Sequence, residues 1–224
     1  MCKQNGWAGR LVVLAAGVAL AWSAPRVAQA QVSCGPSGTD LTVAAGNTVV
    51  LNRYYESPTG TVTVAAGALS VPVGTGQGTA PDVVAGDVLL ILQMQAADID
   101  TSSEAAGGNY ADGAGGNDRS GAVNNSNLIA GQYEYVRATS GVVLGAIGIS
   151  GDGVGGGLIN SYANEDTVGA SGTVRSGIRR YQVVVVRRYR DLTINGTVEA
   201  FAWNGRAGGV VAVAVVGNLS FGAG

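Results

Sequence analysis

The chain has 224 residues, of which 13 are Lys or Arg and 15 are Asp or Glu, with two cysteines and no histidine. The formal net charge of −2 argues against a nucleic-acid partner, because such partners need a basic surface that displaces counterions. The lack of histidine also excludes zinc sites of the usual His/Cys kind and a serine nucleophile activated by a histidine base.

The N-terminal segment, residues 1–30, has the layout of a cleavable export signal. Lys3 and Arg10 give it a positively charged start, and an apolar run follows. The small residues after this run end in Ala28 and Ala30, the two alanines of an A-x-A cleavage pattern. A helix of about twelve residues rises about 18 Å, too little to span a hydrocarbon core of about 30 Å. We therefore expect cleavage after Ala30 and a bacterial protein that is secreted or held at the cell surface, without a membrane span after signal removal.

Cleavage would leave Cys34 as the lone cysteine, so no disulfide within the chain is expected. Lipid attachment at Cys34 would need an apolar residue where Gln31 stands, and it is therefore not expected. All 15 acidic residues follow the signal, which makes the exported part acidic.

The residues after the signal indicate an all-β fold, sandwich-like or irregular. Glycine is abundant, with 37 residues, and short valine-rich runs alternate with clusters of Gly, Asn and Asp. The pattern V-x-A-G-x precedes an apolar run three times, at residues 43–47, 64–68 and 83–87. Because glycine readily takes a positive φ, each copy predicts a strand, a tight turn of the two-residue hairpin kind, and another strand.

Two domains are predicted after the signal. Residues 31–178 are expected to form a β-rich domain around a core strand at residues 88–94, which is apolar on both faces. In the remainder, residues 179–224, the pieces L-T-I-N-G and L-S-F-G recur 27 residues apart. Such repeats indicate stacked coils of a β-solenoid, similar to a parallel β-helix, which needs about three repeats to bury its core. We therefore expect this second part to be the truncated start of a solenoid in a longer protein.

Residues 96–127 are expected to form a long acidic loop rich in glycine. Asp98, Asp100, Asp112 and Asp118 would offer the oxygen ligands that calcium prefers. Their spacing matches neither an EF-hand loop nor a complete glycine-rich calcium repeat. We therefore favour a solvated loop and no cofactor, and keep calcium as the alternative.

A second set of candidate residues combines tyrosine and arginine on predicted strands. Alternation along residues 132–137 predicts that two tyrosines and an arginine share one face. Such side chains would contact a glycan, and arginines near a valine run would grip an anionic polysaccharide or lipopolysaccharide. The sequence favours plainer roles, in which tyrosines pack in the core or against side chains of neighbouring strands and arginines keep a buried strand from pairing wrongly. The candidate glycan contacts are Tyr133, Tyr135, Arg137, Arg188 and Arg190.

Four stretches, taken in order, resemble the N-terminal region of large exported glycine-rich surface proteins of myxobacteria and their relatives, some of them adhesin-like or associated with gliding motility. They are AGDVLLILQMQAADI, the glycine-rich loop after it, GQYEYVRA, and YQVVVVRRYRDLTINGTVEAFAWNGRAGGVVAVAV. The resemblance covers residues 40–224. It implies a β-rich head followed by a glycine-rich β-solenoid and a role at the cell surface, and it carries no functional residues over to this chain.

These observations predict an exported structural or adhesion module without catalytic activity. Its expected partners are extracellular polysaccharide or other cell-surface components. The alternative is a carbohydrate-binding or carbohydrate-active β-helix protein, similar to a polysaccharide lyase or hydrolase, which would use a pair of carboxylates that the sequence does not single out.

Overall fold

The structure is a computed structural model that describes residues 38–100, 123–124, 128–166, 174–176 and 178–222. Within these residues the chain forms strands, turns and a short 3-10 helix at Val154–Gly156, and it forms no α-helix. The predicted all-β class is therefore confirmed. In the same part of the chain, no helix has the length and apolar character needed to cross a membrane.

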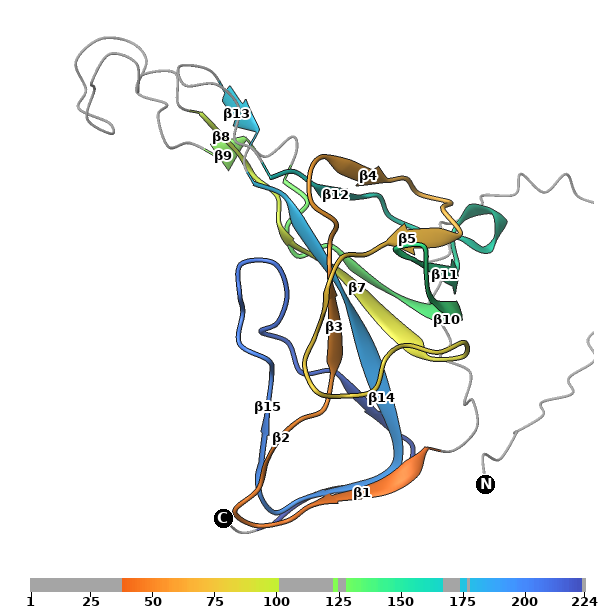
Figure 1. The fold of residues 1–224 in the computed structure, drawn as a ribbon, viewed down its shortest axis with the longest axis vertical. Helices are drawn as coiled ribbons and strands as arrows, with labels where there is room; N and C mark the ends of the chain where they lie inside the picture. Colours follow the sequence, from red (N-terminus) through yellow and green to blue (C-terminus); the bar gives the residue numbers. More distant parts are fainter. Residues whose placement is uncertain (1–37, 101–122, 125–127, 167–173, 177, 223–224) are drawn as a thin grey trace, which may run out of the picture.

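A curled antiparallel sheet, shaped like half a barrel, forms the body of the molecule (Figure 1). At its centre β7 (Val88–Gln95) pairs with β14 (Arg180–Ile194) on one side and with β10 (Tyr133–Val143) on the other. The outer strands are β3 (Arg53–Glu56), β5 (Ser70–Pro72), β6 (Gly76–Gln77) and β11 (Ala146–Ser150). The order across the sheet is β5-β11-β10-β7-β14-β3-β6.

Two smaller antiparallel ladders flank this sheet. One joins β4 (Val62–Val64) to β12 (Tyr162–Asn164), and the other joins β8 (Asp98–Asp100) to β9 (Val123–Asn124) and β13 (Val174–Ser176). The sequence predicted a loop throughout residues 96–127, whereas β8 and β9 lie at the two ends of that span. Ile99 and Val123 are register partners there, and β-branched residues of this kind favour paired strands.

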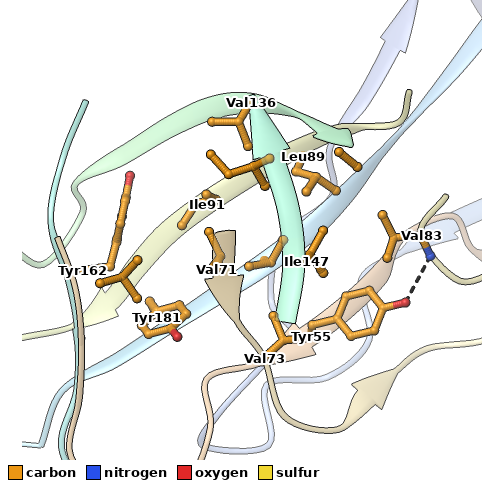
Figure 2. Packing of buried hydrophobic residues seen from close by; sticks show 14 of the residues in the cluster. Tyr55, Val71, Val73, Val83, Leu89, Ile91, Val136, Ile147, Tyr162 and Tyr181 are labelled. Carbon is orange, nitrogen blue, oxygen red and sulfur yellow. Dashed lines mark hydrogen bonds between the residues drawn. The ribbon is translucent and has the colours of Figure 1, made fainter. Parts of the chain in front are cut away.

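The main hydrophobic core lies on one face of the curled sheet (Figure 2). On that face Leu89 and Ile91 of β7 are fully buried, and on the opposite face Val88 and Leu90 are 6% exposed. Residues 88–94 therefore form the core strand with two covered faces that the sequence predicted. The smaller cluster on the opposite face consists of Tyr54, Val88, Leu90, Val184, Val186 and Ala207.

The three V-x-A-G-x copies form three equivalent tight turns. Gly46, Gly67 and Gly86 have φ values of 80°, 81° and 92°, so the predicted positive φ is confirmed. In each turn the residue after the glycine donates its N–H to the carbonyl three positions earlier, over 3.1 Å. The flanking strands do not pair with one another as in a hairpin. A glycine with positive φ at the third turn position is typical of a type II turn, which directs the chain toward other strands.

The long strand β14 leaves the antiparallel sheet and continues into a parallel one, seen at the bottom of Figure 1. There it pairs with β1 (Thr39–Val43), β16 (Val213–Val215) and β17 (Leu219–Phe221). A second parallel ladder joins β2 (Thr48–Val50) to β15 (Thr197–Glu199). The recurring pieces L-T-I-N-G and L-S-F-G are thus direct neighbours, with Leu192 opposite Leu219.

Residues 41–43 supply a third copy of this repeat that the sequence analysis missed. Leu41 and Val43 lie opposite Leu192 and Ile194 of β14. In the described residues β14 pairs in parallel with β1, β16 and β17, and β15 pairs in parallel with β2. A parallel β-solenoid is not shown. The division of the chain at residue 178 remains a prediction, although β1 and β2 on its N-terminal side pair with β14 and β15 on its C-terminal side.

Candidate functional site

The exposed face of β10 carries two of the tyrosines that the sequence singled out. Tyr133 is 59% exposed and Tyr135 is 42% exposed, with ring centroids 6.1 Å apart and planes at 82°. Arg137 follows on the same face because side chains alternate along a strand. These three residues are called the tyrosine face. The sequence favoured core or cross-strand packing for these tyrosines. The structure leaves both side chains exposed, with the two rings edge-on to each other along the strand.

The intervening residues anchor β10 from its other side. Val136 packs into the main core. The buried Glu134 carboxylate accepts hydrogen bonds from the backbone N–H groups of Ile159 (2.8 Å) and Asn160 (3.0 Å). The strand is therefore held by burial on one face while its other face stays open.

An open apolar groove of about 530 Å³ adjoins the tyrosine face. Tyr135 lines it together with Val88 and Leu90 of β7 and Val186 of β14. The other wall is the extended segment 210–214, which packs over the smaller hydrophobic cluster. None of these described lining residues carries a carboxylate, a thiol or an imidazole. The groove therefore offers aromatic and aliphatic contact next to backbone hydrogen-bonding groups.

Buried polar side chains hold this wall in place. Asn52 is fully buried, and its side-chain amide exchanges two hydrogen bonds with the backbone of Ala212. Tyr54 donates its hydroxyl to the Val210 carbonyl over 2.6 Å, and burial raises the pKa of that phenol. Gln182 makes a pair of the same kind with Gly208, at 3.0 and 2.8 Å. Side-chain amides thus bond to the backbone of this wall in the way that a neighbouring strand would. They hold the wall over the sheet and so shape the groove.

Most of the arginines around the valine run of β14 have carboxylate partners. The pairs are Arg179 with Asp98, Arg180 with Asp166, Arg187 with Asp87, and Arg190 with Asp40. Arg190, a candidate glycan contact, is therefore committed to β1. Arg188 has no ion pair and no side-chain hydrogen bond in the described part of the chain, and it is half-buried.

The register places Arg188 beside the groove. Its direct neighbour in the parallel ladder is Ala214, and Val186 precedes it by two residues on the same face. Both neighbours line the groove. Arg137 lies in the row formed by Val88 and Val186. Four of the five candidate glycan contacts therefore share one face of the sheet, and the two arginines lie toward the same end of the groove.

A separate ionic cluster ties the segment after β15 to the body. Arg206 bonds to Asp166 at 2.8 Å and to the carbonyls of Ser57 and Pro58 at 3.1 and 2.9 Å. The N–H of Gly60, and then Arg206, lower the pKa of Asp166 to about 2. These side chains bond to other parts of the same chain and so connect the segment after β15 to the curled sheet.

The candidate calcium residues are not gathered in the described structure. Asp98 is buried and bonds to Arg179 over 2.6 Å. Asp100 belongs to β8, where its backbone lies opposite Val174. Asp112 and Asp118 lie outside the described residues, and no cluster of metal-ligating side chains occurs among those that are described. Calcium binding therefore stays an untested alternative. Ala28 and Ala30 of the expected cleavage site, and Cys34, also lie outside the described residues.

The sequence analysis missed the groove wall and the amides that hold it. Asn52 and Gln182 each interrupt or border an apolar strand, and buried amides need specific partners. An amide residue inside an apolar strand was therefore a sign of such a contact in the sequence. The sequence does not reveal which backbone group the amide bonds to. Comparisons of the chain with protein-family models, with curated proteins and with solved structures gave no match.

Proposed function

We propose that this protein is an exported adhesion module of the bacterial cell surface that binds extracellular polysaccharide without turning it over. The observation that carries the proposal is the tyrosine face, two exposed rings next to an apolar groove on a firmly held strand. Exposed aromatic groups beside a groove are typical of recognition surfaces. The flat apolar faces of sugar rings match such a surface.

Binding without turnover is supported by the chemistry of the groove lining. Hydrolysis or elimination of a polysaccharide requires groups that donate and accept protons at the scissile bond. The nearest described carboxylate on β10 belongs to Glu134, which points away from the tyrosine face and accepts two backbone hydrogen bonds. The groups that line the groove are suited to contact rather than to proton transfer.

A structural role is proposed for the parallel part of the molecule. Leu41, Leu192 and Leu219 stand in one row across three parallel strands, and β2 and β15 continue the same stacking after a turn. Stacked strands with a repeated sequence are how β-solenoid coils bury their core. In this proposal the ladders are solenoid coils that carry the curled sheet at the cell surface.

Polysaccharide binding is tested with the purified protein and a panel of bacterial and plant polysaccharides, with both bound protein and released soluble sugar recorded. We expect binding without release. The double variant Tyr133→Ala/Tyr135→Ala should lose at least fivefold in affinity, while Trp203→Ala, an aromatic outside the tyrosine face, should bind normally. Released sugar would favour the carbohydrate-active alternative, and unchanged binding by the double variant would remove the tyrosine face from the proposal.

Export is tested separately by the mass of the protein recovered outside the cytoplasm. We expect the recovered chain to begin at Gln31. Recovery of the full-length chain in the cytoplasm alone would overturn the cell-surface assignment, whatever the protein binds.

A further inference from the structure

Resting on the proposed function, we infer that the polysaccharide is an anionic one whose carboxylates are recognised by Arg188. The tyrosine face and the groove contact the sugar rings. Arg188 supplies the charge that selects an acidic polymer over a neutral one.

The pairing of the arginines distinguishes Arg188 from its neighbours. Arg187 reaches Asp87 and a backbone carbonyl on one face of β14, and Arg190 reaches Asp40 and Asp191. Between them Arg188 points to the groove face without a carboxylate among the described residues. The sequence favoured a structural role for these arginines, as charges that flank a buried strand. The ion-paired arginines fill that role, whereas Arg188 has no carboxylate partner among the described residues.

A half-buried guanidinium without an anionic partner is an incompletely satisfied charge. Partial burial removes water from the charged group, and that cost is recovered only when an anion takes the place of the water. The planar guanidinium matches the two oxygens of a carboxylate, which it binds through two parallel hydrogen bonds. A uronic acid residue lying along the groove would present such a carboxylate to Arg188.

The surroundings favour an anion at this end of the groove. Arg137 lies on the same face of the sheet, in the cross-strand row of Val88 and Val186. Arg188 is two residues beyond Val186 on β14, so Arg137 adds a second positive charge near it. The nearby carboxylates of Asp87 and Glu134 belong to residues that alternate to the opposite face and bond to Arg187 and to backbone N–H groups. The net negative charge of the chain acts over long range and is screened by salt beyond about 10 Å.

A polymer fits this surface better than a lipid. The tyrosine face and the arginines are spread along β10 and β14, so that a ligand touching Tyr133 and Arg137 spans about 13 Å of strand. The groove beside Tyr135 is open to solvent, whereas an acyl chain gains most when it is fully enclosed. The ligand of this surface is therefore a carboxylate-bearing polysaccharide rather than a lipid.

The test compares two polymers with the same backbone, polygalacturonate and its methyl ester, in which esterification removes the carboxylate charge. The wild-type protein should bind polygalacturonate at least tenfold more tightly, and this preference should shrink as sodium chloride is raised. Arg188→Gln should bring both polymers to the same affinity, and Arg188→Lys should keep part of the preference. Arg190→Gln is the matched control, since it removes the same charge two residues further along the strand and should leave the preference intact.

Several outcomes would overturn the inference. They are equal affinity of the wild type for both polymers, an unchanged preference in Arg188→Gln, an equal loss in Arg190→Gln, and binding to anionic lipid vesicles but to neither polymer. The comparison of polymers needs only the wild type, so it holds even where a variant folds poorly. If both polymers bind equally and Tyr133→Ala/Tyr135→Ala abolishes binding, the proposed function stands and the role of Arg188 falls; if no polysaccharide binds, both fall.

Discussion

The side chain of Asn52 and the backbone of Ala212 are joined by two hydrogen bonds, at 2.6 Å from the amide nitrogen to the carbonyl and at 3.0 Å from the backbone N–H to the amide oxygen. The same amide nitrogen also donates to the carbonyl of Val185 over 2.8 Å. A single fully buried amide thus connects β14 to the segment that walls the groove. Loss of the Asn52 amide should therefore lower both the stability of the protein and its affinity for a ligand in the groove.

Replacing Asn52 by leucine should destabilise the protein by about 2–4 kcal/mol, because several buried backbone groups lose their partner at once. Chemical denaturation measures this as a lower midpoint with an unchanged slope. Hydrogen exchange should also rise at residues 210–214 before it rises in β7. Asn47→Leu, at an exposed turn position, is the control and should change stability by no more than about 0.5 kcal/mol. Equal effects of the two changes would mean that the amide does not hold the groove wall.

The stability of the parallel ladder should depend more on Leu192 than on Leu219, its neighbour on the adjacent strand. Leu192 is fully buried in the middle of the ladder, whereas Leu219 at its side is 47% exposed. Leu192→Ala should cost about 2–5 kcal/mol of unfolding free energy, and Leu219→Ala should cost less than half as much. Thermal denaturation followed by circular dichroism would compare them, and similar losses would contradict the proposed burial of the middle strand.

A substitution in the turn between β10 and β11 should increase the stability of the protein. Leu144 has φ 50° and is fully exposed, and Gly145 after it has φ 75°. A two-residue hairpin loop with two positive φ values prefers Asn-Gly, and a leucine is strained in the left-handed region. Leu144→Asn should therefore stabilise the protein by about 0.5–1 kcal/mol, and Leu144→Val should destabilise it. A lower melting temperature for the asparagine variant would show that the exposed leucine makes stabilising contacts.

The pH dependence of stability should include a contribution from Asp166. Because its pKa is lowered from 3.8 to about 2 in the folded protein, the unfolded chain takes up the proton at higher pH than the folded one. This contribution is fully present above the ordinary pKa and is lost as the pH falls through about 2. Wild type should therefore be more stable than Asp166→Asn at neutral pH, with the difference vanishing in strong acid. Asp152→Asn, at an exposed position, is the control, and a difference between wild type and Asp166→Asn that persists at the lowest pH would contradict the assignment.

Local features of the chain were predictable because they depend on neighbouring residues. The glycines of the three V-x-A-G-x copies take positive φ because turn geometry is set within four residues. Alternation along β10 correctly placed Tyr133, Tyr135 and Arg137 on one face. The run at residues 88–94 correctly indicated a strand covered on both sides. In each case the physical signal lies in side-chain period or backbone freedom, which the sequence displays directly.

The sequence by itself determined that this chain is all-β, where it turns and which side chains share a strand face. Only the tertiary structure decided which strands meet, as when Leu41 near the start of the described chain lies opposite Leu192. Strand pairing joins backbone groups that are identical in every residue, so the partner is selected by packing of the whole molecule rather than by a local pattern. For the same reason the sequence could not say which carboxylate each arginine meets. Arg190 reaches Asp40 only because β1 stacks beside β14, and Arg188 meets no carboxylate among the described residues.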